Sequence, residues 1–136
     1  DEWSEELGGA LGGDLLQPTR IYVKPVLAAI EAADIHGISH ITGGGFYENI
    51  PRCLPEGLTA KIEKNALWID PIFRMIQRLG DIPERDMFNT FNMGTGMVLI
   101  VDKNDADKVR TLLLAAGQAP RIIGEVVPGD GGVELL

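Results

Sequence analysis

The chain has 136 residues, of which 45% are hydrophobic and 24% charged, an ordinary composition for one soluble domain with a hydrophobic core. Its net charge of −8 and sequence pI near 4.6 argue against binding to nucleic acid or to an anionic membrane, because both need clustered Lys and Arg. A single cysteine, Cys53, excludes an internal disulfide and a cysteine-rich zinc site, and no apolar run approaches the roughly 20 residues of a membrane span.

The first 14 residues carry five acids and four glycines, so we expect a linker with one helical turn. Nothing at the start resembles a signal peptide, and the chain opens on Asp1 without an initiator Met. We therefore expect a cytoplasmic protein, of which this chain is a fragment.

The chain then passes from an extended start into a helix. Residues 20–23 (RIYV) are predicted to be extended. Pro25 fits the first turn of a helix, where its missing N–H needs no partner. Val26, Leu27 and Ile30 give this helix an apolar stripe at helical spacing.

Two strands and two helices are predicted in the middle of the chain. Residues 35–42 alternate loosely as a strand, and residues 58–64 (LTAKIEK) alternate cleanly as a half-exposed strand. Asp70 and Pro71 predict the N-cap and first residue of a helix that Gly80 ends. A second, shorter helix is expected over residues 84–91.

The last third alternates in the same way. Residues 97–101 (MVLIV) form a continuous apolar run, which is typical of a central strand covered on both faces. Asn104 is predicted to cap a helix that ends before Gly117, and residues 121–127 and 133–136 are predicted strands. Strands and helices alternate throughout, so the class is layered α/β or α+β.

Common self-contained catalytic motifs are absent. The sequence contains no GxxxxGK[ST] phosphate loop, no GxGxxG and no GxSxG. His36 and His40 would share one face of a strand, but no carboxylate is predicted beside them, so we predict no metal site. Cys53 is interpreted as a small buried hydrophobic residue, since nothing next to it would lower its pKa.

The segment HITGGGFYENIP contains the most informative pattern. Successive backbone N–H groups at Gly43, Gly44 and Gly45 can surround an anion, and the positive end of a following helix would add to this. Thr42 can supply a hydroxyl and Asn49 a side-chain amide. The alternative is a tight turn with a positive φ, for which one or two glycines suffice, so we favour the anion interpretation.

Three segments in order carry a family resemblance: LLQPTRIYVKPVL (15–27), HITGGGFYENIPRCLP (40–55) and MFNTFNMGTGMVLIV (87–101). Together they resemble the C-terminal domain of the phosphoribosylformylglycinamidine cyclo-ligase (AIR synthetase) family. Selenophosphate synthetase, thiamine-phosphate kinase and a hydrogenase maturation factor are related to this family.

The resemblance implies a fold and an activity. The fold is α+β, a three-layer α/β/α domain with a mixed sheet over residues 15–136. Residues 1–14 would be a linker from an N-terminal ATP-binding domain of the same polypeptide. The family enzyme, a homodimer, uses ATP and Mg²⁺ to activate the formyl oxygen of formylglycinamidine ribonucleotide, and ring closure then gives aminoimidazole ribonucleotide. Most nucleotide and metal contacts belong to the N-terminal domain, so the isolated chain is expected to be inactive.

The resemblance also implies roles for residues. His40 would hydrogen-bond the substrate or stabilise developing negative charge, or else be a partly buried histidine bonded to backbone. Arg20 would bind phosphate or form a surface ion pair, and Arg52 is a second guanidinium candidate. The substrate- or phosphate-binding set is Thr19, Arg20, Thr42, Gly43, Gly44, Gly45, Asn49 and Asn92, and no residue is assigned to a metal.

Other interpretations stay open at this level. The phosphate on the glycine run can come from the substrate or from ATP. The chain can also be a non-catalytic domain that binds a phosphorylated metabolite, or part of a related kinase such as thiamine-phosphate kinase. The aromatic residues near the motifs are predicted to be core: Phe46, Tyr47, Phe88 and Phe91.

Overall fold

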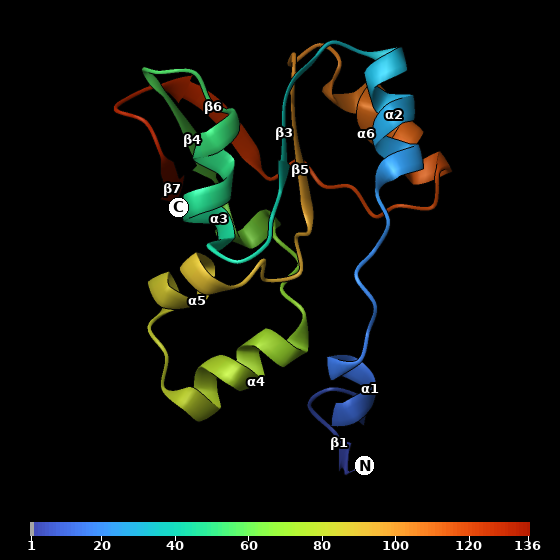
Figure 1. Cartoon of the computed structure of the whole chain (residues 1–136), viewed down its shortest axis with the longest axis vertical. Helices are drawn as coiled ribbons and strands as arrows, with labels where there is room; N and C mark the ends of the chain where they lie inside the picture. The colour runs from blue at the N-terminus through green and yellow to red at the C-terminus, as the bar shows by residue number, and fades with distance from the viewer. Residues whose placement is uncertain (1) are drawn as a thin grey trace.

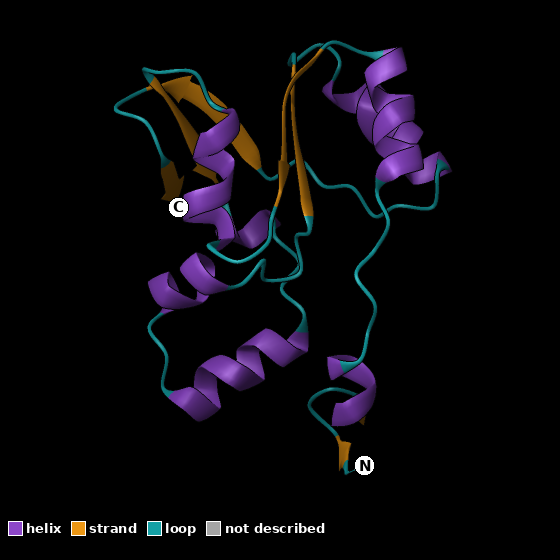
Figure 2. Cartoon of the chain, viewed as in Figure 1, coloured by secondary structure: helices purple, strands orange, loops and turns teal. Residues whose placement is uncertain are grey.

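The computed structural model describes residues 2–136 and confirms the predicted α+β class (Figures 1 and 2). The helices are α1 (Leu11–Leu15), α2 (Val23–Ala32), α3 (Gly45–Asn49), α4 (Pro71–Gly80), α5 (Glu84–Thr90) and α6 (Ala106–Ala115). The strands are β1 (Trp3–Ser4), β2 (Gly9–Ala10), β3 (Ile35–His40), β4 (Leu58–Ile62), β5 (Met97–Val101), β6 (Gly124–Pro128) and β7 (Val133–Leu135). Two 3-10 helices, η1 (Ile50–Cys53) and η2 (Lys64–Ala66), complete the fold. None of the helices within residues 2–136 is long and apolar enough to cross a membrane.

The strands form a ribbon and a mixed sheet. β3 and β5 pair antiparallel, whereas β4 is the middle of a second sheet with β6 antiparallel on one side and β7 parallel on the other. The predicted mixed sheet is therefore confirmed. Helices α2 and α6 pack together on one side of the β3–β5 ribbon, and η1 contacts both β3 and β4 on the other (Figure 1).

The core lies between α3, α5 and the mixed sheet. Phe46 and Phe88 are fully buried and meet edge to face, with their ring centroids 5.3 Å apart, a favoured aromatic geometry. The predicted burial of these two rings is confirmed, and Tyr47 and Phe91 are partly buried against the core cluster. The buried cluster consists of Ile41, Phe46, Ile50, Ala60, Ile62, Leu67, Met87, Phe88 and Met93.

The expected environments of β4 and β5 are exchanged. β4 was expected to be half exposed, but it is the middle strand of its sheet and Thr59, Ala60 and Ile62 are buried, the last two within the core cluster. The Thr59 hydroxyl donates to the Gly131 carbonyl at 3.1 Å, which satisfies the buried polar side chain. β5 was expected to be a central strand, yet in the described chain it pairs only with β3 and stays half-buried.

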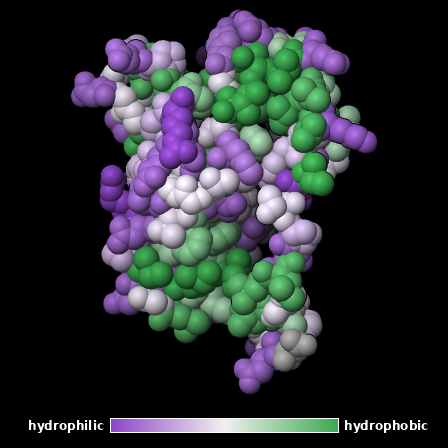
Figure 3. Space-filling model, in the orientation of Figure 1, coloured by the Kyte–Doolittle hydropathy of each residue, from purple (hydrophilic) through white to green (hydrophobic). Residues whose placement is uncertain are grey.

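The start of α2 also differs from expectation. Residues 20–22 form no strand, because Tyr22 already has helical backbone angles and its carbonyl accepts the Val26 N–H at 3.0 Å. Pro25 lies in the first turn as predicted. Two residues of the apolar stripe face outward, since Leu27 is 54% and Ile30 46% exposed, whereas Val26 is half-buried; Figure 3 shows apolar side chains gathered over this helix.

Helix boundaries show two corrections. Asp70 and Pro71 do begin α4, but the Asp70 carboxylate accepts the Trp68 indole N–H at 2.9 Å instead of capping the helix. The helix ends one residue later than predicted, with Asp81 in the left-handed conformation. Asp105, not Asn104, is the N-cap of α6. Asn104 instead donates hydrogen bonds from its backbone N–H and its side-chain amide to the Asp102 carboxylate in the preceding turn.

The N-terminal segment holds the predicted helical turn as α1. The short antiparallel pair of β1 and β2 ahead of it was not predicted. The domain boundary near residue 15 stays a prediction.

Candidate functional site

Two predicted motifs meet at one end of the β3–β5 ribbon (Figure 1). β3 ends at His40, which lies opposite Met97 at the start of β5. The Ile41 N–H donates to the Gly96 carbonyl at 2.9 Å. The antiparallel pairing therefore places residues 42–45, here called the glycine loop, beside the loop of residues 92–96.

The requirement for glycine differs among the three positions of this loop. A Cβ at Gly45 would lie 1.9 Å from the Phe88 carbonyl oxygen, and Gly44 has φ +93°. These two glycines are required by the fold. An added Cβ at Gly43 meets no atom within 4 Å and φ there is ordinary, so the turn alone does not explain this glycine.

The loop presents free donors to solvent. Thr42 and Gly43 are exposed and Gly44 is half-buried. Within residues 2–136, the N–H groups of Gly43 and Gly44 donate no hydrogen bond, whereas the Gly45 N–H donates to the Thr42 carbonyl at 3.0 Å. Two adjacent unpaired N–H groups form the kind of backbone nest that binds anions.

Asn49 lies beneath this loop. Its side-chain amide Nδ2 lies 2.8 Å from the Gly45 carbonyl oxygen, 3.2 Å from that of Gly43 and 3.3 Å from that of Thr42. Arg52 donates to its Oδ1 at 3.4 Å. The structure therefore directs the Asn49 amide at the loop backbone.

His40 and Arg20 line one open hollow of about 420 Å³. Its wall is mostly apolar and consists of Arg20, Ile21, Tyr22, Val23, Val26, Leu27, His40 and Met97. His40 is exposed, so the alternative of a partly buried histidine is wrong. Arg20 forms no ion pair among the described residues; its Nη1 donates to the Gln118 Oε1 at 3.3 Å.

Sequence reasoning missed Tyr22. Its ring packs edge-on against His40, with centroids 6.0 Å apart and planes at 66°. Its hydroxyl occupies the space next to Gly96, where an added Cβ would lie 2.0 Å from Tyr22 Oη. The glycine in the NMGTG motif was the available signal, because a missing side chain there makes room for another group.

The remaining predicted residues lie around these groups. Thr19 is exposed in the segment between α1 and α2. The Asn92 side-chain oxygen accepts the Gly94 N–H at 3.0 Å, which closes the turn of the neighbouring loop. Asn92 thus shapes the 92–96 loop, and its binding role stays a prediction.

We expect Gly96→Ala to displace Tyr22 and with it the edge of the ring that supports His40. Forcing the hydroxyl away should lower the free energy of unfolding by about 1–3 kcal/mol. Urea denaturation measures this loss, and the His40 ring proton shifts report the loss of the Tyr22 ring. Gly13→Ala is the control, since nothing lies within 4 Å of its added Cβ. Unchanged His40 shifts in folded Gly96→Ala would contradict this packing.

Cys53 is half-buried in η1, and its thiol contacts the Ile50 carbonyl with Sγ 3.2 Å from the oxygen. Burial raises the pKa of the Cys53 thiol above its ordinary value, with an opposing contribution from a backbone hydrogen bond. We expect the folded chain to react with a disulfide reagent at pH 8 severalfold more slowly than the urea-unfolded chain, since the thiolate is the reactive form. Equal reaction rates of the folded and unfolded chains would contradict the raised pKa of the thiol.

The sign of the pH dependence follows from the same shift. Because the raised pKa favours the protonated thiol in the folded state, its contribution to stability is present below the ordinary pKa of a thiol and falls as the pH rises through the raised pKa of the folded state.

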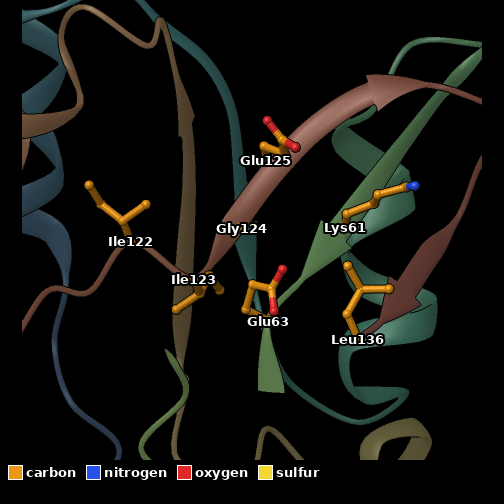
Figure 4. Close-up of a pocket in the computed structure, with 7 residues that line it drawn as sticks. All are labelled: Lys61, Glu63, Ile122, Ile123, Gly124, Glu125 and Leu136. Atoms are coloured by element: carbon orange, nitrogen blue, oxygen red, sulfur yellow. The ribbon is translucent and has the colours of Figure 1, made fainter. Parts of the chain in front are cut away.

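A second hollow, of about 280 Å³, lies by the mixed sheet (Figure 4). Lys61, Glu63 and Glu125 contribute charged groups to it, and Lys61 also pairs with Glu134 at 3.4 Å. It includes none of the predicted site residues. Among the residues that the structure describes, no three His, Cys, Asp or Glu side chains are arranged to hold a metal ion.

Comparison with known proteins gives a consistent result. The profile of the family described as "AIR synthase related protein, C-terminal domain" matches residues 1–135. The phosphoribosylformylglycinamidine cyclo-ligase of Caldicellulosiruptor saccharolyticus is 53% identical over 131 residues, covering 96% of this chain and 38% of that protein. The protein of the same name from Alkaliphilus oremlandii is 53% identical over 134 residues, which are 98% of this chain and 39% of that protein.

A solved structure shares the fold. The crystal structure of E. coli HypE, a hydrogenase maturation protein, superimposes with a TM-score of 0.69 at 23% identity, covering 90% of this chain and 38% of that one. This likeness concerns the fold alone. The chain spans about two fifths of the length of the curated relatives that it matches.

Proposed function

The chain belongs to the family of AIR synthase related proteins, as their C-terminal domain, and on this premise we propose that it is the C-terminal part of a phosphoribosylformylglycinamidine cyclo-ligase. The reaction closes the imidazole ring of aminoimidazole ribonucleotide in purine biosynthesis. The observation that carries the proposal is the 53% identity over almost the whole chain to proteins of that name.

The glycine loop would bind the 5′-phosphate of formylglycinamidine ribonucleotide. Its two unpaired N–H groups, at Gly43 and Gly44, suit a phosphate oxygen, and the Thr42 hydroxyl adds a donor. These donors are local dipoles, so they can hold an anion although the chain carries a net charge of −8. Gly43 has no role in packing, which also supports a ligand close to its backbone.

His40 and Arg20 would act on the rest of the substrate. Both line the hollow that borders the start of the glycine loop, and His40 is exposed there. The imidazole can donate a hydrogen bond to the formyl oxygen as negative charge develops on it. The Arg20 guanidinium can neutralise an anionic group without first breaking an ion pair, because its bond is to the neutral Gln118.

The metal ion would be held outside the residues that the structure describes. ATP, when bound, supplies the phosphoryl group that activates the formyl oxygen. Among the described residues no three His, Cys, Asp or Glu side chains are arranged around a point where a metal ion could bind. We therefore assign Mg²⁺ and most contacts to ATP to an N-terminal domain of the same polypeptide, joined through residues 1–14.

The outward apolar face of α2 fits this division of labour. Val23, Leu27 and Ile30 are exposed at helical spacing, and such a patch commonly marks a contact surface. The N-terminal domain would cover it in the whole enzyme, which would be a cytoplasmic homodimer.

A chimera tests the proposal. This chain replaces the matching residues of the Caldicellulosiruptor saccharolyticus protein, and aminoimidazole ribonucleotide and ADP are measured with formylglycinamidine ribonucleotide and Mg-ATP. We expect both products in equal amounts. A folded chimera that forms neither, beside an active parent protein, would contradict the assignment.

A charge variant of the chimera tests the loop. Gly43→Asp fits sterically but sets a carboxylate where the phosphate would bind, so kcat/KM should fall by at least about tenfold. Gly13→Asp is the matched control for the added charge and should leave the activity unchanged. Equal activity of the two variants would contradict phosphate binding on the glycine loop.

A further inference from the structure

Asn49 is the buried polar residue on which the glycine loop rests. Asn49 is the last residue of α3 and is 5% exposed. The amide nitrogen lies within hydrogen-bonding distance of three loop carbonyls, those of Thr42, Gly43 and Gly45. The amide oxygen accepts from Arg52, so the two ends of the amide are distinguished by their partners.

These bonds fix the direction of the loop's N–H groups. The chain has no cis peptide bond among the described residues, and in a trans peptide the N–H points opposite to the preceding carbonyl. The carbonyls of Thr42 and Gly43 converge on Asn49. The N–H groups of Gly43 and Gly44, which belong to the same two peptide units, therefore point away from it.

The Thr42 carbonyl also accepts the Gly45 N–H at 3.0 Å, so the Gly43 carbonyl is the one that depends on this amide. Within residues 2–136 the Gly43 carbonyl has Asn49 as its only hydrogen-bond partner. Without Asn49, that carbonyl would have to turn toward water, and the exposed loop has room to do so at Gly43. Rotating this peptide unit would turn the Gly44 N–H inward.

We propose that Asn49 is a positioning residue for phosphate: it never touches the ligand, but gathers the loop carbonyls so that the N–H groups of Gly43 and Gly44 face the phosphate. This inference rests on the proposed function of the glycine loop. It differs from the sequence-based expectation that the Asn49 amide itself binds phosphate.

The test uses the ¹⁵N-labelled 136-residue chain and inorganic phosphate as the probe. In the wild-type chain we expect phosphate to shift the Gly43 and Gly44 amide signals and to leave the Asn49 side-chain amide signal nearly in place. Asn49→Asp replaces the donor by a carboxylate that cannot serve carbonyls. In the folded variant the phosphate Kd should rise by about tenfold or more, as expected when the charge-assisted hydrogen bond from the Gly44 N–H is lost.

Matched measurements separate positioning from simple stability. Asn65→Asp makes the same chemical change at an exposed position and should bind phosphate as the wild type does. The thermal midpoint of each variant is measured in parallel, and binding is compared only well below it. If Asn49→Asp does not fold, Asn49→Ser replaces it, because one hydroxyl can serve only one of the three carbonyls.

The outcomes are distinct. Wild-type binding that is lost in the folded Asn49 variant supports the inference. Equal binding by the folded variant overturns it and leaves the proposed function intact, as does a large phosphate-induced shift of the Asn49 side-chain amide, which would make it a ligand. If phosphate does not shift the Gly43 and Gly44 amide signals of the wild-type chain, both the proposed loop function and the inference that rests on it are overturned.

Discussion

Replacing Gly45 with alanine is expected to lower the free energy of unfolding by about 2–5 kcal/mol, combining about 1–2 for the left-handed backbone and about 1–3 for the displaced helix. The added Cβ would lie 1.9 Å from the Phe88 carbonyl oxygen and 2.9 Å from that of Phe91. Both are backbone atoms at the end of α5 and cannot swing aside. Because small domains are stable by only about 5–15 kcal/mol, the variant should unfold at markedly lower urea concentration, as followed by circular dichroism.

Gly43, two residues earlier in the glycine loop, provides the control for this prediction. Gly43→Ala changes the same loop by the same group, but its Cβ meets nothing within 4 Å and its φ is ordinary. Its unfolding free energy should stay within about 0.5 kcal/mol of the wild-type value. If both variants lost the same stability, the close contact between α3 and α5 would be refuted.

Phe88→Ala is expected to cost about 3–5 kcal/mol of stability, the usual range for a buried aromatic ring. The ring is 1% exposed and packs edge to face on Phe46, so its removal leaves a cavity under the glycine loop. Urea denaturation gives the free energy, and the amide signals of the loop report whether the cavity also disturbs it.

Phe91→Ala provides the comparison. Phe91 is only half-buried and packs against Phe73, with ring centroids 5.6 Å apart. Its loss should be smaller, about 1–2 kcal/mol. A cost for Phe91 that equals or exceeds the cost for Phe88 would contradict the position of the core.

Local signals predicted most of the elements. Pro25 and Pro71 mark the first turns of α2 and α4, and alternation marks β3 and β4. The environment of each strand could not be predicted the same way. Burial depends on which strand is flanked by others, so LTAKI became a middle strand and the fully apolar MVLIV did not. The residues within either segment do not indicate which strands will pair with it.

The candidate site was predicted in outline only. The TGGG sequence predicted the position of the loop, because a tight turn needs only one or two glycines and three in a row indicate a further requirement. The separate causes appear only in three dimensions: Gly45 makes room for α5, Gly44 takes a positive φ, and Gly43 is left free. Tyr22 was missed because its relation to His40 and Gly96 depends on the packing of α2 beside the ribbon. The burial of Asn49 beneath the loop was likewise not readable from sequence.

An amide NMR titration of this chain with formylglycinamidine ribonucleotide and, separately, with Mg-ATP shows which ligand the glycine loop binds. We predict that the ribonucleotide shifts the amide signals of Gly43 and Gly44 and that Mg-ATP leaves them in place. Shifts of these amides with Mg-ATP alone, or with neither ligand, would contradict the claim that the glycine loop binds the substrate phosphate.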